Sequence, residues 1–252
     1  MNGEHTNALP APIEVRALRK SFRGQKVLQG IELRVARGET LSVLGRSGTG
    51  KSVLLKLLAG LEAPDSGSIR VHGLEVPKLP RRRLSALRKR MGFLFQSGAL
   101  YDSLTVAQNV AFPLERHSGL TRAEIGGRVR TLLVAVGMAE HAEKLPGEIS
   151  GGMQKRVGLA RALALDPDIL LCDEPTAGLD PITAGEIDEL LLKLQRERGM
   201  TSIVVTHDLP GARRVSDRLA LMNEGRILAE GTFEDLEGSS DDFVKRFLER
   251  RN

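Results

Sequence analysis

The sequence has a single cysteine, Cys172, among 252 residues. A disulfide within the chain is therefore excluded, and with it any fold that depends on disulfides. Cys172 ends the apolar run ILLC at residues 169–172. In that setting we expect a small buried hydrophobic side chain and not a reactive thiol.

Long hydrophobic runs are also missing. The longest, VLLKLLAGL at residues 53–61, falls well short of the roughly 20 residues that cross a bilayer. Residues 1–15 contain no apolar segment of signal-peptide length. We therefore expect a protein that stays in the cytosol, although a partner could place it on a membrane.

Tandem repeats, low-complexity linkers and sustained heptads are absent as well. The net charge is +5, from 37 basic and 32 acidic side chains. This mild excess suits an anionic ligand or a position next to a membrane, and does not by itself indicate nucleic acid. With 41% hydrophobic residues, the chain has an ordinary globular composition and length for one large domain or two small ones.

Alternating apolar and polar residues at 13–22 and 26–38 predict antiparallel strands at the N-terminus. Short apolar strands then alternate with helical patterns, which indicates a parallel sheet covered on both faces. The predicted strands of this core are residues 39–45, 67–73, 91–96, 168–174 and 201–208. Between about residues 97 and 165 only helical patterns occur. We expect one domain over 1–252, with 97–165 as a helical subdomain and about 239–252 as a C-terminal tail.

The stretch GRSGTGKS matches the phosphate-binding pattern G-x-x-x-x-G-K-[ST], after a predicted strand and before a predicted helix. Its glycines let backbone N–H groups converge on phosphate oxygens, and the helix that begins near Lys51 adds its positive end. Lys51 would neutralise the terminal phosphates, and the Ser52 hydroxyl would ligate Mg²⁺. The predicted nucleotide-binding residues of this loop are Gly45, Arg46, Ser47, Gly48, Thr49, Gly50, Lys51 and Ser52.

Two carboxylates follow the apolar strand in DILLCDEP. Asp173 is expected to hold Mg²⁺, and Glu174 is expected to orient and polarise the attacking water. Gln96 and His207 end two other predicted strands. Because ligands of open α/β sheets gather at the carboxyl ends of strands, we place Gln96 near Mg²⁺ and the water, and His207 near the γ-phosphate.

A second candidate phosphate cradle is ISGGM at residues 149–153, which opens a predicted helix. No strand, lysine or metal ligand of its own accompanies it, so a second complete nucleotide site is not expected. We predict instead that Ser150, Gly151 and Gly152 grip the γ-phosphate of ATP bound to a second copy of the chain, across a two-fold interface. Asp180 is placed to contact that copy.

These motifs, in this order and spacing, resemble the ATP-binding cassette (ABC) ATPases over nearly the whole chain. The resemblance implies an α/β fold with a P-loop NTPase (RecA-like) core, an N-terminal antiparallel β layer and a helical subdomain bearing the signature. It also implies that Phe22 stacks on adenine, with a place in the core as the alternative. One departure is Met153, where the family signature L-S-G-G-Q has glutamine.

In detail, FQSGALYDSLTV, ISGGM and DPIT resemble the ATPase of Mla-type transporters. This likeness implies phospholipid transport that maintains outer-membrane lipid asymmetry, together with a permease that holds the chain at the inner membrane and an MCE-domain protein. Leu100, Tyr101 and Leu104 would border the permease groove, with a buried turn as the alternative. A cassette for another substrate stays open, as does a non-transport ABC ATPase acting on nucleic acid or ribosomes.

Two further segments have open readings. The basic segment 81–90 is expected to be a solvated helix with Leu84 and Leu87 on the core, and contact with lipid headgroups or the permease is the alternative. In the tail, four apolar side chains would pack on their own chain, or dock on the second ATPase copy or on a small regulatory subunit: Phe243, Val244, Phe247 and Leu248.

Overall fold

The computed structural model describes residues 11–249. Most of the segment in which no signal peptide is expected, and the last three residues of the predicted tail, therefore lie outside the described residues. Within residues 11–249, no helix combines the length and the apolar character needed to cross a bilayer.

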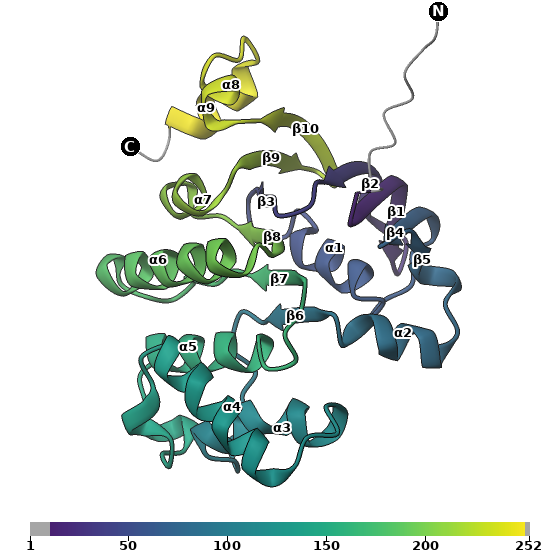
Figure 1. Ribbon diagram of the computed structural model, residues 1–252. Coiled ribbons are helices and arrows are strands. Elements are labelled where there is room, and N and C mark those ends of the chain that lie inside the picture. The colour runs from purple at the N-terminus through teal and green to yellow at the C-terminus, as the bar shows by residue number, and fades with distance from the viewer. Residues whose placement is uncertain (1–10, 250–252) are drawn as a thin grey trace, which may run out of the picture.

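The N-terminal layer is a four-stranded antiparallel sheet in the order β2-β1-β4-β5 (Figure 1). Its strands are β1 (Ile13–Phe22), β2 (Gln25–Val35), β4 (Ser66–Val71) and β5 (Leu74–Glu75). On β1, Ile13, Val15 and Leu18 are buried. The predicted antiparallel β layer is confirmed, and it also contains β4, which the sequence analysis placed in the parallel core.

The second sheet has six strands in the order β10-β9-β3-β8-β7-β6, and all but β10 run parallel. Its strands are β3 (Thr40–Leu44), β6 (Met91–Leu94), β7 (Ile169–Asp173), β8 (Thr201–Thr206), β9 (Arg218–Asn223) and β10 (Arg226–Gly231). Every residue of β3, β7 and β8 is buried, as continuous apolar runs in a covered parallel sheet predict.

Helices cover both faces of this sheet (Figure 1). Helix α1 (Lys51–Leu58) lies between the two sheets and buries Leu54, Leu55, Leu57 and Leu58 in one apolar cluster with both of them. Helices α6 (Pro181–Arg198) and α7 (Leu209–Val215) cover the opposite face. These layers are those of a P-loop NTPase core, so the predicted fold class is confirmed.

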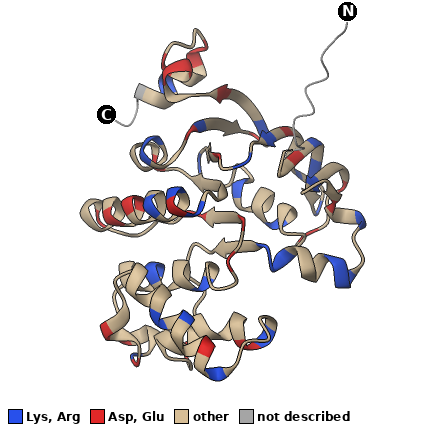
Figure 2. Cartoon of the chain, viewed as in Figure 1, with Lys and Arg blue, Asp and Glu red and all other residues tan. Residues whose placement is uncertain are grey.

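The predicted basic helix is α2 (Arg81–Arg88), much of which is blue for Lys and Arg in Figure 2. Leu87 is buried, and Leu84 is half-buried against the first apolar cluster. Arg81, Arg82 and Arg83 are exposed. The expected solvated helix with one apolar side is therefore what the structure contains.

Three helices lie beyond β6, at the bottom of Figure 1: α3 (Val106–His117), α4 (Arg122–Ala135) and α5 (Gly151–Ala162). Thr105 and Thr121 begin α3 and α4 with capping boxes. Short 3₁₀ turns at Ala139–His141 and Pro146–Glu148 lead into α5. The apolar cluster of these helices continues onto Leu170 of β7 and Leu191 of α6, so the helices pack directly on the sheet.

The C-terminal part contains elements that the sequence did not indicate, namely β9, β10 and α8 (Phe233–Glu237). Helix α9 (Asp242–Glu249) follows. Val244 is fully buried in a third apolar cluster with Leu44 and Leu219, and Phe247 packs against that cluster. Of the two readings of the tail, packing on its own chain is the one observed.

Candidate active site

The carboxyl ends of four neighbouring parallel strands bring the predicted residues to one edge of the sheet. Leu44 of β3 pairs with Thr206 of β8, and Val205 pairs with Asp173 of β7. The P-loop, His207 and Glu174 follow these strands directly, and Gln96 lies two residues beyond the end of β6. The edge position predicted for all four is therefore present, with Gln96 and His207 just past their strands and not within them.

The P-loop connects β3 to α1 and needs glycine at two positions. A Cβ on Gly45 would lie 2.4 Å from the carbonyl oxygen of Met222, and Gly50 has a φ of 104°. Buried Lys51 donates from Nζ to the carbonyl oxygens of Gly45 (2.8 Å) and Arg46 (3.1 Å). The lysine ammonium is thus held inside the curve of the loop.

A hydroxyl and a carboxylate meet beside this loop. Ser52 Oγ donates to Asp173 Oδ1 at 2.7 Å. Burial raises the pKa of Asp173, and the neighbouring Glu174 adds to this, while the Ser52 hydrogen bond, Lys56 and Lys51 oppose it. Hydroxyl and carboxylate oxygens are the ligands Mg²⁺ favours. Within residues 11–249 there is no group of three or more His, Cys, Asp or Glu side chains suited to a metal. The oxygens of Ser52 and Asp173 fit the ligand chemistry of Mg²⁺.

Glu174 has a partner for each carboxylate oxygen. Oε1 lies 3.4 Å from Lys51 Nζ. Oε2 accepts from His207 Nδ1 (2.7 Å), from the His207 backbone N–H (3.2 Å) and from Thr206 Oγ1 (3.3 Å). The φ of Glu174 is 48°, a left-handed conformation that is unfavourable for a residue with a Cβ. The carboxylate is therefore fixed between the P-loop lysine and His207.

One buried residue of the site escaped the sequence analysis. Lys155 on α5 is 5% exposed, and its Nζ donates to the carbonyl oxygens of Gln96 and, at 3.2 Å, Glu174. Burial lowers the pKa of Lys155, and Asp173 and Glu174 act in the opposite direction. Its place in the sequence, inside a helical pattern, carried no signal of these contacts.

Ser150, Gly151 and Gly152 begin α5. Ser150 is the N-cap, and its Oγ accepts from the Met153 N–H at 3.3 Å. A Cβ on Gly152 would lie 2.5 Å from Thr183 Cγ2, so packing alone requires this glycine. At Gly151 the nearest atom, Leu179 Cδ2, would be 3.7 Å away, which leaves room for a Cβ. The fold therefore explains Gly152 but not Gly151.

The remaining two candidates have local roles. Asp180 is the N-cap of α6, and its Oδ1 accepts from the N–H groups of Ile182 and Thr183, each at 3.1 Å. Hydrogen bonding with Thr183, first through its side chain and then through its N–H, lowers the pKa of Asp180, and the Ile182 N–H acts in the same direction. Phe22 ends β1 and is 40% exposed, with Lys20 Nζ 4.8 Å from the centre of its ring. It is thus a surface aromatic and not a core residue.

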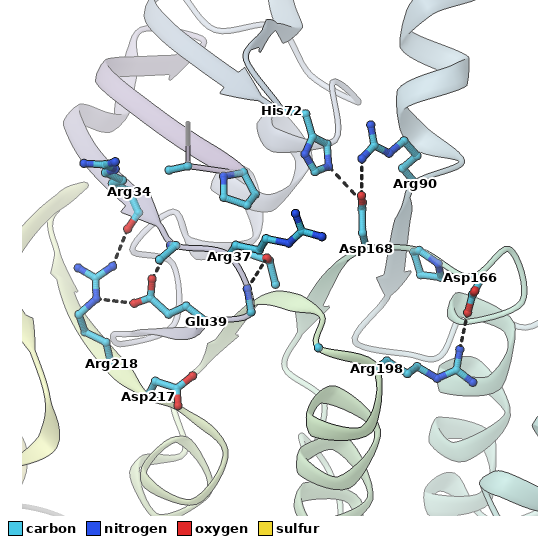
Figure 3. A pocket seen from close by; sticks show the side chains of 17 residues that line it. Arg34, Arg37, Glu39, His72, Arg90, Asp166, Asp168, Arg198, Asp217 and Arg218 are labelled. Atoms are coloured by element: carbon cyan, nitrogen blue, oxygen red, sulfur yellow. Dashed lines mark hydrogen bonds and ion pairs between the residues drawn. The ribbon is translucent and has the colours of Figure 1, made fainter. Parts of the chain in front are cut away.

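A cavity of about 1320 Å³ lies at the opposite, amino edge of the parallel sheet (Figure 3). Its carboxylates already have partners in the same wall. Asp168 contacts His72 and Arg90, Asp166 contacts Arg198, and Glu39 accepts from Arg218. The volume of this cavity therefore does not identify the active site, whose chemical groups lie at the carboxyl edge of the sheet.

The site combines a P-loop lysine, a hydroxyl–carboxylate pair and a second, fixed carboxylate. This is the arrangement of a P-loop nucleoside triphosphatase. The fold and this edge of the sheet assign the protein to that class.

Comparison with known proteins narrows the class. The family model described as "ABC transporter" matches residues 28–177. The chain is 45% identical over 226 residues to the methionine import ATP-binding protein MetN of Caulobacter vibrioides, covering 89% of this chain and 68% of that one. It is 39% identical over 251 residues to the probable ribonucleotide transport ATP-binding protein mkl of Mycobacterium leprae, covering 100% and 72%.

A solved structure agrees with these sequences. The ATP-binding cassette MJ0796, determined as a dimer in a post-hydrolysis state with ADP and Pi, has a TM-score of 0.81 and 32% identity. The match covers 87% of this chain and 98% of that chain. The protein belongs to the ABC transporter family and is an ATPase.

Proposed function

We propose that two copies of the chain bind and hydrolyse ATP between them and drive a membrane permease. The observation that carries this proposal is the separation of the machinery within one chain. Lys51, Ser52, Asp173 and Glu174 contact one another, whereas the hydroxyl of Ser150 hydrogen-bonds to its own helix. The exposed Ser150–Gly151 corner, with space at Gly151, suits a phosphate presented by a second copy.

In this proposal each residue has a distinct part. Lys51 and the P-loop N–H groups hold the phosphates, and Ser150 to Gly152 of the other copy close over the γ-phosphate. Glu174 orients and polarises water, and Gln96 lies near both this water and Mg²⁺. His207 fixes the carboxylate of Glu174 and lies near the γ-phosphate. Mg²⁺, held by Ser52 and Asp173, would neutralise developing phosphate charge. Phe22 would stack on adenine, and Asp180 would lie at the interface.

The permease would dock in a groove of about 410 Å³ beside β6. Its walls are largely apolar and aromatic, and they include Phe95, Tyr101 and Phe112. Of the three residues that the sequence placed there, Tyr101 lines the groove and is 47% exposed, whereas Leu100 packs against the second apolar cluster. For Leu100 the packing supports the alternative expectation, a buried turn, and Leu104 does not line the groove either.

For the cargo we propose phospholipids, with an MCE-domain protein as a further partner. The support is the resemblance in residues 95–106, 149–153 and 180–183, including Met153 in the signature. Methionine is the second candidate, because MetN is 45% identical over most of this chain. We further propose that 1–252 acts as one domain, for which the apolar cluster shared by α3, α4, α5 and β7 is the support.

Transport assays on cells that lack this chain separate the two cargoes. If the cargo is phospholipid, phospholipid should accumulate in the outer leaflet of the outer membrane of these cells. The wild-type chain should restore lipid asymmetry, and Glu174→Gln should not. Reduced uptake of labelled methionine with unchanged lipid asymmetry would support the second candidate. Purification in detergent tests for the membrane partner. A multi-span permease should co-purify with the wild-type chain and should be lost with Tyr101→Asp. Co-purified RNA or DNA would contradict a role in transport.

A further inference from the structure

The residue that links the groove side of the molecule to the catalytic carboxylate is Lys155. It lies one turn into α5, after the signature residues, and is almost fully enclosed. A buried ammonium is costly unless it is well paired. Within residues 11–249 no carboxylate oxygen lies within ion-pair distance of Nζ, which instead bonds to two backbone carbonyls. If this position only had to fill space in the core, an apolar side chain would do so without the cost of burying a charge.

Both carbonyls belong to residues of the active site. The Glu174 carbonyl is part of a left-handed backbone conformation, with φ of 48°, and also accepts from the Ala177 N–H at 3.2 Å. On the other side, the Glu174 N–H donates to the Val205 carbonyl at 2.8 Å. An unfavourable conformation of this kind persists only when the surrounding contacts determine it. Lys155 is one of those few contacts.

The other carbonyl belongs to the loop that borders the groove. Past Gln96, the carbonyls of Gly98 and Ala99 accept from Arg161 at 2.8 and 2.7 Å. Arg161 also projects from α5, and Ala99 and Arg161 line the groove. Helix α5 therefore holds the loop at two points, through Lys155 and through Arg161. Lys155 also donates to the carbonyl of Glu174, so it connects the loop to the catalytic residue.

We propose that Lys155 is a positioning residue, which holds Glu174 in its catalytic conformation and ties that conformation to the Gln96 loop. If a permease docks in the groove beside this loop, Lys155 would also connect the permease to Glu174, and that part of the proposal rests on the proposed function. The positioning of Glu174 does not, and it can be measured on the chain alone.

The test compares Lys155→Met, which keeps the length of the side chain without its donors, with Lys155→Gln, whose amide keeps two N–H groups. We expect Lys155→Met to lower kcat roughly tenfold or more with little change in the KM for ATP, because misplaced catalytic groups cost rate rather than binding. Lys155→Gln should recover most of the rate. Lys193→Met, at an exposed site on α6, is the matched control and should leave the rate unchanged.

A double-mutant cycle separates positioning from general damage. If Lys155 acts through Glu174, Lys155→Met should lower the single-turnover rate far less in a Glu174→Gln background than in the wild type. Equal fold losses in the two backgrounds, a wild-type rate for Lys155→Met, or no difference between the Met and Gln variants would each overturn the proposal. Thermal unfolding of every variant shows whether it is folded under the assay conditions.

Discussion

The Oε2 atom of Glu174 lies 2.7 Å from Nδ1 of His207, although the two residues follow different strands. Nε2 is then the ring nitrogen that is left for other partners. The pairing also turns the other oxygen, Oε1, toward Lys51. Two strand ends thus set the direction of the carboxylate before any substrate contact.

Replacing the carboxylate tests its role directly. Glu174→Gln keeps the shape of the side chain but removes the charge that polarises water, so we expect kcat to fall by about 100-fold or more. ATP binding should remain, and the ATP-bound dimer should accumulate in size-exclusion chromatography. Glu189→Gln, at an exposed position of α6, is the control. Normal hydrolysis by Glu174→Gln would remove Glu174 from the assigned role.

Gly151 offers a test of the partner-facing corner. Because a Cβ there would meet its nearest neighbour only at 3.7 Å, Gly151→Ala should leave the unfolding temperature unchanged or higher. The same methyl group would block the approach of a phosphate, so ATPase activity should fall at least roughly tenfold. Gly127→Ala, in α4 with nothing near its Cβ, should keep full activity. Full activity of Gly151→Ala would mean that no ligand comes close to this corner.

A buried carboxylate makes stability depend on pH. Burial raises the pKa of Asp188 from 3.8 to about 6, nearby Asp208 adds to this, and Arg214, with Nη1 2.9 Å from Oδ2, opposes it. Between these pH values the folded chain keeps a proton that the unfolded chain releases. The contribution of Asp188 to the free energy of unfolding therefore falls as pH rises from about 4 to about 6.

Asp188→Asn removes this component. The free energy of unfolding is measured with denaturant at about pH 4.5 and about pH 7.5. Between these pH values it should rise more, or fall less, in the variant than in the wild type. An identical change in both proteins would show that Asp188 has an ordinary pKa in the folded state.

The edge of the sheet was predictable because strand ends are visible in sequence. The apolar runs before Glu174 and His207 mark buried parallel strands, and such strands end at one edge. Lys155 was not predictable, since its partners are backbone carbonyls 59 and 19 residues away that carry no side-chain signal. The same applies to Gly152, whose need for glycine comes from Thr183 on another helix. Strands β9 and β10 were missed in a region where the motifs gave no guidance.

Ser150 has two separable roles, and the variants must distinguish them. As the N-cap of α5 its loss to alanine should cost about 1 kcal/mol of stability. Ser150→Asp keeps a capping oxygen but adds a negative charge that repels phosphate. We expect Ser150→Asp to be as stable as the wild type and nevertheless inactive. An active Ser150→Asp would leave only the capping role.

Mixing two inactive variants tests most directly whether each ATP site is built from two chains. Lys51→Ala and Ser150→Ala should each be inactive alone. In a mixed dimer, one site combines the intact Lys51 of one chain with the intact Ser150 of the other. An equal mixture should therefore recover ATPase activity to roughly a quarter of the wild-type rate, as random pairing gives. A mixture no more active than its components, or a Ser150→Ala protein with full activity by itself, would contradict the account.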